Sequence, residues 1–171
     1  FKEKFITSRG YDPTVFYPVF GGKIIDSVEK TERFLWDFRK VAQELVINNY
    51  ANTIKKKAHK HGMTYSNQPY DMNPAGDFDL GAVADIPSCE FWDHRNSDLV
   101  DALYSCIEAT SIGHILNKKI ISAEAFTSIL PNRFHSYPGQ MKNQTDWAFA
   151  MGINNIIFHT FPHQPLGDNF K

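Results

Sequence analysis

Two glutamates lie in surroundings that suit acid–base chemistry. Glu124 ends the largely apolar run Lys-Lys-Ile-Ile-Ser-Ala and precedes Ala-Phe-Thr-Ser, while Glu90 stands between Ile-Pro-Ser-Cys and Phe-Trp. A carboxylate among apolar and aromatic groups can exchange a proton with a reacting group. For Glu124 this interpretation is favoured over an exposed or arginine-paired acid, because no basic residue is adjacent. For Glu90 the catalytic and structural interpretations are balanced.

A ring and imidazole cluster closes the sequence. His159 and His163 alternate with Phe158 and Phe161. Aromatic faces pack well against the C–H faces of a sugar, and aromatic residues reach 14% of the chain. The alternative is a phenylalanine-rich core, which is the better interpretation for most of these rings. A zinc site would need a third ligand that the spacing does not supply.

Acidic and amide residues crowd the long connection that is predicted to run from position 69 to position 92, and Asn67 stands just before it. They are Asn67, Asp71, Asn73, Asp77, Asp79 and Asp85. Such oxygen-rich clusters bind Ca²⁺ or hydrogen-bond sugar hydroxyls, but the spacing is not that of an EF-hand. A solvated acidic loop is an equally good interpretation. Long loops in compact domains are functional or disordered, and the interleaved rings favour order.

Three helix-then-strand units must position these side chains. The first helix is predicted to start with Asp26 as its N-cap and to end at Gly62, followed by a short strand over 63–68. A second helix is predicted over about 97–117, with a strand over 118–124 whose last residue is Glu124. A third helix ends at Gly152 and leads into a strand over 155–159. The apolar core face expected for the first helix is Phe34, Leu35, Phe38, Val41, Ala42, Leu45 and Val46.

This alternation predicts an α/β fold with a parallel sheet. Gln68, Glu124 and His159 fall at the carboxyl ends of their predicted strands, where a (β/α)₈ barrel gathers its active site. A doubly wound sheet would usually carry a glycine-rich phosphate loop, and none occurs here. Three or four strands cannot close a TIM-type barrel, so residues 1–171 are expected to be the later part of one catalytic barrel domain.

Composition and charge limit the classes of partner that the chain is expected to bind. The 18 basic and 19 acidic residues nearly cancel, which leaves no charge pattern for nucleic acid or an anionic membrane. No apolar stretch approaches the roughly 20 residues that a membrane helix needs. Cys89 and Cys106 lack metal-site spacing and are predicted to be buried thiols. The chain starts at Phe1 inside a helical run, which predicts further residues upstream.

Several ordered stretches resemble the catalytic domain of glycoside hydrolase family 106, the α-L-rhamnosidases. They run along nearly the whole chain, and their order makes the resemblance specific although each is short. The stretches are Arg9-Gly10-Tyr11-Asp12, Glu32-Arg33-Phe34-Leu35-Trp36-Asp37-Phe38, Gln68-Pro69-Tyr70, Ala84-Asp85-Ile86-Pro87, Glu90-Phe91-Trp92, Ala123-Glu124-Ala125-Phe126-Thr127-Ser128, Asp146-Trp147-Ala148-Phe149, Gly152-Ile153-Asn154, His159 and His163-Gln164-Pro165.

The resemblance implies an inverting exo-hydrolase of terminal α-L-rhamnosides, secreted or periplasmic, often with Ca²⁺ in its site. Glycosidases use two carboxyl groups, one as acid and one as base or nucleophile. The base is expected to be Glu124 or Glu90. The residues expected to contact the sugar are Gln68, Tyr70, Asp85, Trp92, Phe126, His159 and His163.

The general acid implied by the resemblance lies on an Asp-Ser-x-Glu segment just before Arg9-Gly10-Tyr11-Asp12. This sequence has no such segment there; Asp26-Ser27-Val28-Glu29 has the same letters but reads as a helix start. The expected partners are therefore a carbohydrate and the remainder of a parent chain that carries the acid. Two alternatives are a non-catalytic carbohydrate-binding fragment and a retaining barrel glycosidase, whose carboxyl groups would lie ~5 Å apart instead of ~6.5–9.5 Å.

Overall fold

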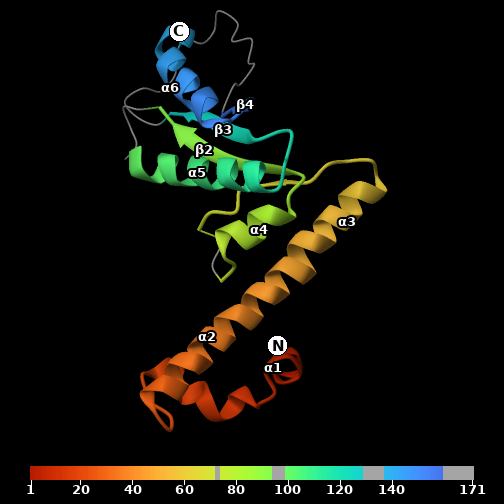
Figure 1. The fold of residues 1–171 in the computed structure, drawn as a ribbon, viewed down its shortest axis with the longest axis vertical. Coiled ribbons are helices and arrows are strands. Elements are labelled where there is room, and N and C mark those ends of the chain that lie inside the picture. The colour runs from red at the N-terminus through yellow and green to blue at the C-terminus, as the bar shows by residue number, and fades with distance from the viewer. Residues whose placement is uncertain (72–73, 94–98, 129–136, 160–171) are drawn as a thin grey trace, which may run out of the picture. The chain divides into compact units, whose positions relative to one another are not determined.

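A computed structural model describes residues 1–71, 74–93, 99–128 and 137–159. The chain divides into two compact units. Unit 1 comprises residues 1–65 and 69–85, and unit 2 comprises residues 66–68 and 86–171. Figure 1 shows the elements of both. Unit 1 is helical and unit 2 holds the sheet, so each is described by itself.

Unit 1 is built around one long helical rod. Its elements are α1 (Lys2–Arg9), the 3₁₀-helix η1 (Pro13–Gly21), α2 (Val28–Leu45), the π-helical segment η2 (Val46–Ala51), α3 (Asn52–Lys60) and α4 (Asp77–Val83). Helices α2 and α3 follow one another through η2 with helical backbone throughout, as the orange ribbon in Figure 1 shows. The predicted helix therefore forms, with a π-helical interruption at its centre.

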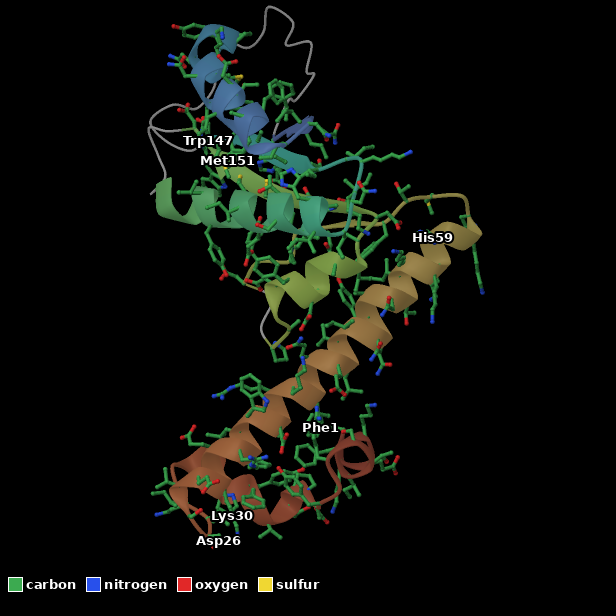
Figure 2. All side chains as sticks on the ribbon, in the orientation of Figure 1. Phe1, Asp26, Lys30, His59, Trp147 and Met151 are labelled. Atoms are coloured by element: carbon green, nitrogen blue, oxygen red, sulfur yellow. The ribbon has the colours of Figure 1, made fainter. Side chains whose placement is uncertain are left out.

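The rod begins one residue later than predicted. Ser27, not Asp26, is the N-cap of α2, because its hydroxyl accepts a hydrogen bond from the backbone N–H of Lys30. Asp26 has a positive φ of 61° and pairs through its side chain with the ammonium group of Lys30, next to it in Figure 2. Ser27 therefore caps the helix, and Asp26, which was predicted to do so, pairs with Lys30 instead.

The predicted core face of the rod is confirmed at Phe34 and Val41. Both side chains are fully buried, together with Phe5 and Val19. Phe34 is ringed by other aromatic side chains, with Phe16 stacked on it at 5.1 Å between ring centroids. Some rings of this unit therefore form a phenylalanine-rich core, whereas others, such as Trp36, are exposed. A second small cluster of buried residues lies where η2 packs near α4. It consists of Ala51, Ala75 and Leu80.

Unit 2 is a parallel sheet of four strands in sequential order, β1-β2-β3-β4. The strands are β1 (Ser66–Asn67), β2 (Ile86–Trp92), β3 (Ser122–Thr127) and β4 (Asn155–Phe158), and the helices are α5 (Leu99–Ile115) and α6 (Pro138–Met151). Helices α5 and α6 make the crossovers that parallel pairing requires between β2, β3 and β4. The predicted α/β organisation with a parallel sheet is confirmed.

The strand predictions were wrong in three places. Residues 86–92, expected to be part of a loop, form β2, which pairs with both β1 and β3. This strand was not predicted because acidic residues precede it and because Pro87 is its second residue. Proline is rare inside sheets. Strand β3 begins at Ser122 and continues to Thr127, so Glu124 is its third residue and not its last. The strand predicted over 63–68 shortens to Ser66–Asn67.

Helices cover one face of this sheet. Cys89 and Phe91 of β2 and Ala123 of β3 are fully buried against Cys106 and Ala109 of α5. Trp147 and Met151 of α6, labelled in Figure 2, pack against the same core. Since side chains alternate along a strand, Glu90 and Glu124 are directed to the opposite face.

In the described part of the chain, no helix is both long and apolar enough to cross a bilayer.

Candidate functional site

Both oxygens of Glu124 face polar side chains that directly follow two other strands of the sheet, β1 and β4. The side-chain N–H₂ of Gln68, directly after β1, donates to Oε2 at 3.1 Å, and Nδ1 of His159, directly after β4, lies 3.5 Å from Oε1. The structure thus brings together the three strand-end residues predicted from the sequence. The Glu124 side chain is 29% exposed, which leaves it accessible to a ligand.

Glu90 lies beside Glu124 on the same face. The two residues are Cα partners in the parallel ladder between β2 and β3, where adjacent strands are about 4.8 Å apart. Helix α5 fixes the Glu90 backbone, because the Ser105 hydroxyl donates to its carbonyl oxygen at 3.0 Å and the Cys106 thiol donates to the same oxygen at 3.7 Å. Two carboxylates are therefore presented side by side from a rigid sheet.

A β-bulge reshapes the end of β3. Phe126 has a left-handed φ of 66°, and the register shifts so that Trp92 pairs with Thr127 instead of Phe126. A left-handed backbone is uncommon for a residue as bulky as phenylalanine. Bulges of this kind change the direction of side chains near functional sites. Phe126 is only 6% exposed, and its ring packs on Phe91 and Phe158.

The bulge turns Thr127 towards the site. Its hydroxyl oxygen lies 2.9 Å from Nδ1 of His159, the same nitrogen that faces Glu124. Sequence analysis did not identify this threonine. The only signal that could have done so was its place in the Ala-Glu-Ala-Phe-Thr-Ser stretch, since simple alternation assigns it to the core face.

Other predicted sugar contacts have different surroundings. Trp92 ends β2, and its carbonyl oxygen accepts a hydrogen bond from the Gln144 side chain of α6. Tyr70 and Asp85 belong to unit 1, and His163 lies outside the described residues. No contact seen here tests the sugar-binding roles of these residues, so those roles stay predictions.

Asp85 is tied to two basic side chains within unit 1. Lys55 Nζ lies 2.9 Å from Oδ1, His59 Nε2 lies 2.6 Å from Oδ2, and the backbone N–H of Tyr65 donates to Oδ2 at 2.9 Å. Burial favours a raised pKa for Asp85, but the hydrogen bonds from these three groups and the charge of Lys55 outweigh it, so the pKa lies well below its usual range. This carboxylate anchors the end of α3 to the segments around Tyr65 and Asp85.

The described residues of the acidic connection do not gather into a metal cluster, and Asn73 lies outside the described residues. Asp77 and Asp79 occupy the first turn of α4, where acids suit the helix dipole, and Asp79 also meets Lys40 and Gln43 of α2. Over the described ranges there is no group of three or more His, Cys, Asp or Glu residues that could hold a metal ion.

The chemistry open to unit 2 is that of paired carboxylates. Within the residues that the structure describes, no lysine or arginine forms an ion pair with Glu90 or Glu124. Such acids can take a proton from water or give one to a leaving group, as in glycosidic bond hydrolysis.

Known proteins of similar sequence and fold identify the family of the chain. The chain is 36% identical over 165 residues to the "Putative beta-glucuronidase" of Formosa agariphila, covering 96% of this chain and 14% of that protein. A rhamnosidase from Novosphingobium sp. PP1Y has the same fold, with a TM-score of 0.80 and 24% identity over 98% of this chain and 16% of that one. The chain thus spans a small part of the length of either relative. Residues 1–170 match the family model of glycoside hydrolase family 106, described as alpha-L-rhamnosidase, and the chain therefore belongs to this family.

Proposed function

We propose that this chain is part of a longer glycosidase that removes terminal α-L-rhamnose, and that Glu124 is its general base. The observation that carries the proposal is the setting of Glu124, which has both oxygens held by Gln68 and His159 and stands beside Glu90 on one sheet face. Family membership supports the substrate class.

In the proposed reaction Glu124 activates a water molecule. The carboxylate takes a proton from water while the water oxygen forms a bond to the anomeric carbon, and the glycosidic C–O bond breaks on the opposite face of the sugar. A second carboxyl group protonates the leaving oxygen. We assign that acid to the parent chain outside these residues, as the family resemblance implies.

Glu124 is the better candidate for the base than Glu90 because it is oriented. A general base must hold its lone pair in line with the attacking water, and misplacement lowers the rate steeply. Gln68 and His159 supply this orientation through polar contacts from two other strands. For Glu90, the hydrogen bonds from Ser105 and Cys106 fix the backbone.

We infer that the sheet is the later part of a (β/α)₈ barrel that the parent chain completes. The parallel strands follow one another without a reversal, as barrel strands do, whereas a doubly wound sheet reverses its order at a switch point. The helices cover the face opposite Glu90 and Glu124, which matches a barrel with helices outside.

Calcium stays a prediction of the family resemblance. Ca²⁺ takes about 6–8 oxygen ligands, and the described residues hold no cluster of three or more suitable side chains. These residues alone do not fit a calcium site, so no step of the proposed mechanism uses the ion. Activity of the parent protein after chelation, with and without added Ca²⁺, tests the prediction. A periplasmic or secreted location is likewise proposed from the resemblance.

The name of the Formosa relative favours a second candidate substrate, a β-glucuronide. The full-length parent is therefore assayed on nitrophenyl α-L-rhamnoside and nitrophenyl β-D-glucuronide, with the anomer of the first product followed by NMR. Release of β-L-rhamnose supports inversion. Cleavage of the glucuronide alone contradicts the proposed substrate, α-L-rhamnose as first product contradicts inversion, and binding of rhamnosides without turnover indicates a carbohydrate-binding protein.

A further inference from the structure

We infer that Thr127 is a positioning residue, which holds His159 with its proton on Nδ1 and leaves Nε2 to accept a hydrogen bond from a sugar hydroxyl. This inference rests on the proposed function, because it concerns the same site. It adds a role for the bulge at the end of β3.

The proton position follows from what surrounds Nδ1. This nitrogen lies 2.9 Å from the Thr127 hydroxyl oxygen and 3.5 Å from Oε1 of Glu124. An ionised carboxylate can only accept, and a hydroxyl oxygen accepts as well as donates. A proton on Nδ1 satisfies both neighbours, whereas a lone pair there would face the carboxylate. In the neutral ring the other nitrogen, Nε2, is then an acceptor.

The bulge is what makes this contact available. Without the left-handed residue at Phe126, strand alternation would direct Thr127 to the helix-covered face, away from Glu124. The register shift opposite Trp92 places it instead within reach of His159. Backbone strain of this type persists where the surrounding packing enforces it, and it gathers at ligand sites. Here the buried Phe126 ring, between Phe91 and Phe158, supplies that packing.

The ring of His159 is free enough to meet a ligand. Its side chain is 48% exposed, and its backbone N–H bonds to the carbonyl oxygen of Ala125 at 3.0 Å, which extends the β4 ladder by one residue. The backbone is therefore fixed while the ring stands at the strand end. A site that hydrogen-bonds a substrate hydroxyl discriminates strongly against an analogue that lacks it.

The test uses Thr127→Val, Thr127→Ser and Thr127→Asn variants of the full-length parent. Valine has nearly the shape of threonine but cannot bond Nδ1, so His159 is left to Glu124 alone and kcat/KM is expected to fall roughly tenfold, the effect of one lost hydrogen bond. Serine keeps the hydroxyl and is expected to stay within about threefold of wild type. Asparagine offers a carbonyl acceptor and is expected to fall between them.

Deoxy substrates identify the hydroxyl that Nε2 accepts. Wild-type and Thr127→Val parents are compared on rhamnosides lacking the 2-, 3- or 4-hydroxyl. One analogue is expected to lower kcat/KM strongly in wild type and much less in the valine variant, because the two changes remove the same interaction. Thr145→Val is the matched control, since among the described residues its hydroxyl bonds only within α6, to the carbonyl oxygen of Met141.

The outcomes distinguish failure of the Thr127 inference from failure of the proposed function. If valine and serine variants lose activity equally, or valine loses none, or every deoxy analogue affects wild type and valine alike, Thr127 does not position His159. If the parent cleaves β-glucuronides and not rhamnosides, the proposed substrate is wrong and the same comparison is scored on the glucuronide. If it cleaves neither, both proposals fall.

Discussion

The two units hold their carboxylates in different ways. In unit 1, Asp37 and Glu44 both meet Arg9, and Asp85 meets Lys55 and His59. In unit 2, Glu124 is held by the amide of Gln68 and the imidazole of His159. A strong cation neutralises an acid and makes it a structural anchor. An amide orients an acid without neutralising its charge, which leaves the acid able to exchange a proton.

The largest effect is expected at Glu124. Glu124→Gln keeps the shape of the side chain but replaces one carboxylate oxygen by an N–H₂ donor and removes the proton acceptor, so kcat of the parent on a rhamnoside is expected to fall at least about a hundredfold. Glu90→Gln serves as the control on the same sheet face and is expected to cost less. Steady-state kinetics of both variants measure the difference, and a larger loss at Glu90 would reverse the assignment.

Asp85 is expected to matter for stability. Asp85→Asn removes the negative charge from a carboxylate held by three donors, so the free energy of unfolding is expected to fall by about 2 kcal/mol at pH 7. Urea unfolding followed by circular dichroism measures this change. A loss of activity with unchanged stability would instead favour the sugar-binding role predicted from the sequence.

The effect at Asp85 should depend on pH with a defined sign. Its pKa is lowered in the folded state, so the stabilisation is fully present above the ordinary carboxyl pKa and is lost as pH falls below that value towards the folded one. The difference between wild type and Asp85→Asn should therefore narrow in acid. A difference that grows on acidification would contradict the ion-pair account.

Gln68 should show a smaller effect on activity. Gln68→Leu removes the donor to Oε2 of Glu124 while keeping a similar volume, and kcat is expected to fall roughly fivefold to tenfold through loss of orientation. Gln144→Leu, on α6, is the matched control because it removes an amide that bonds only the Trp92 carbonyl oxygen in the described structure. Equal losses in both variants would indicate general destabilisation.

The smallest effect is expected at an exposed ion pair of unit 2. Lys142 and Asp146 pair one turn apart on α6, and both side chains are largely exposed. Pairs of this kind contribute about 0.3–0.5 kcal/mol, so Lys142→Ala should leave stability and activity almost unchanged. A loss above about 1 kcal/mol in urea unfolding would show that pairing on this surface matters more than exposure suggests.

Much of the fold could be predicted because periodicity reports burial. Phe34 and Val41 repeat at helical spacing and are buried, and the apolar runs around Ala123 and Ile156 form neighbouring strands. Strand β2 was missed because its pairing partners are distant in sequence and Pro87 stands near its start. The helix start at Ser27 was misplaced by one residue because two adjacent side chains can both accept hydrogen bonds there.

Part of the candidate site could also be predicted from the sequence. Gln68, Glu124 and His159 were identified because each was predicted to stand at the carboxyl end of a strand, and parallel strands bring such residues together, although Glu124 is the third residue of β3. Thr127 could not be identified in this way. Its direction depends on the left-handed backbone of Phe126, which tertiary packing imposes and no local propensity favours.

Chemical rescue tests the assignment of the base most directly. An azide ion needs no deprotonation, so azide should restore turnover to the parent carrying Glu124→Ala, where the shortened side chain leaves room, and give a rhamnosyl azide of inverted configuration. The Glu90→Ala variant should gain nothing. Rescue at Glu90 with none at Glu124 would show that the two neighbouring carboxylates have the opposite roles.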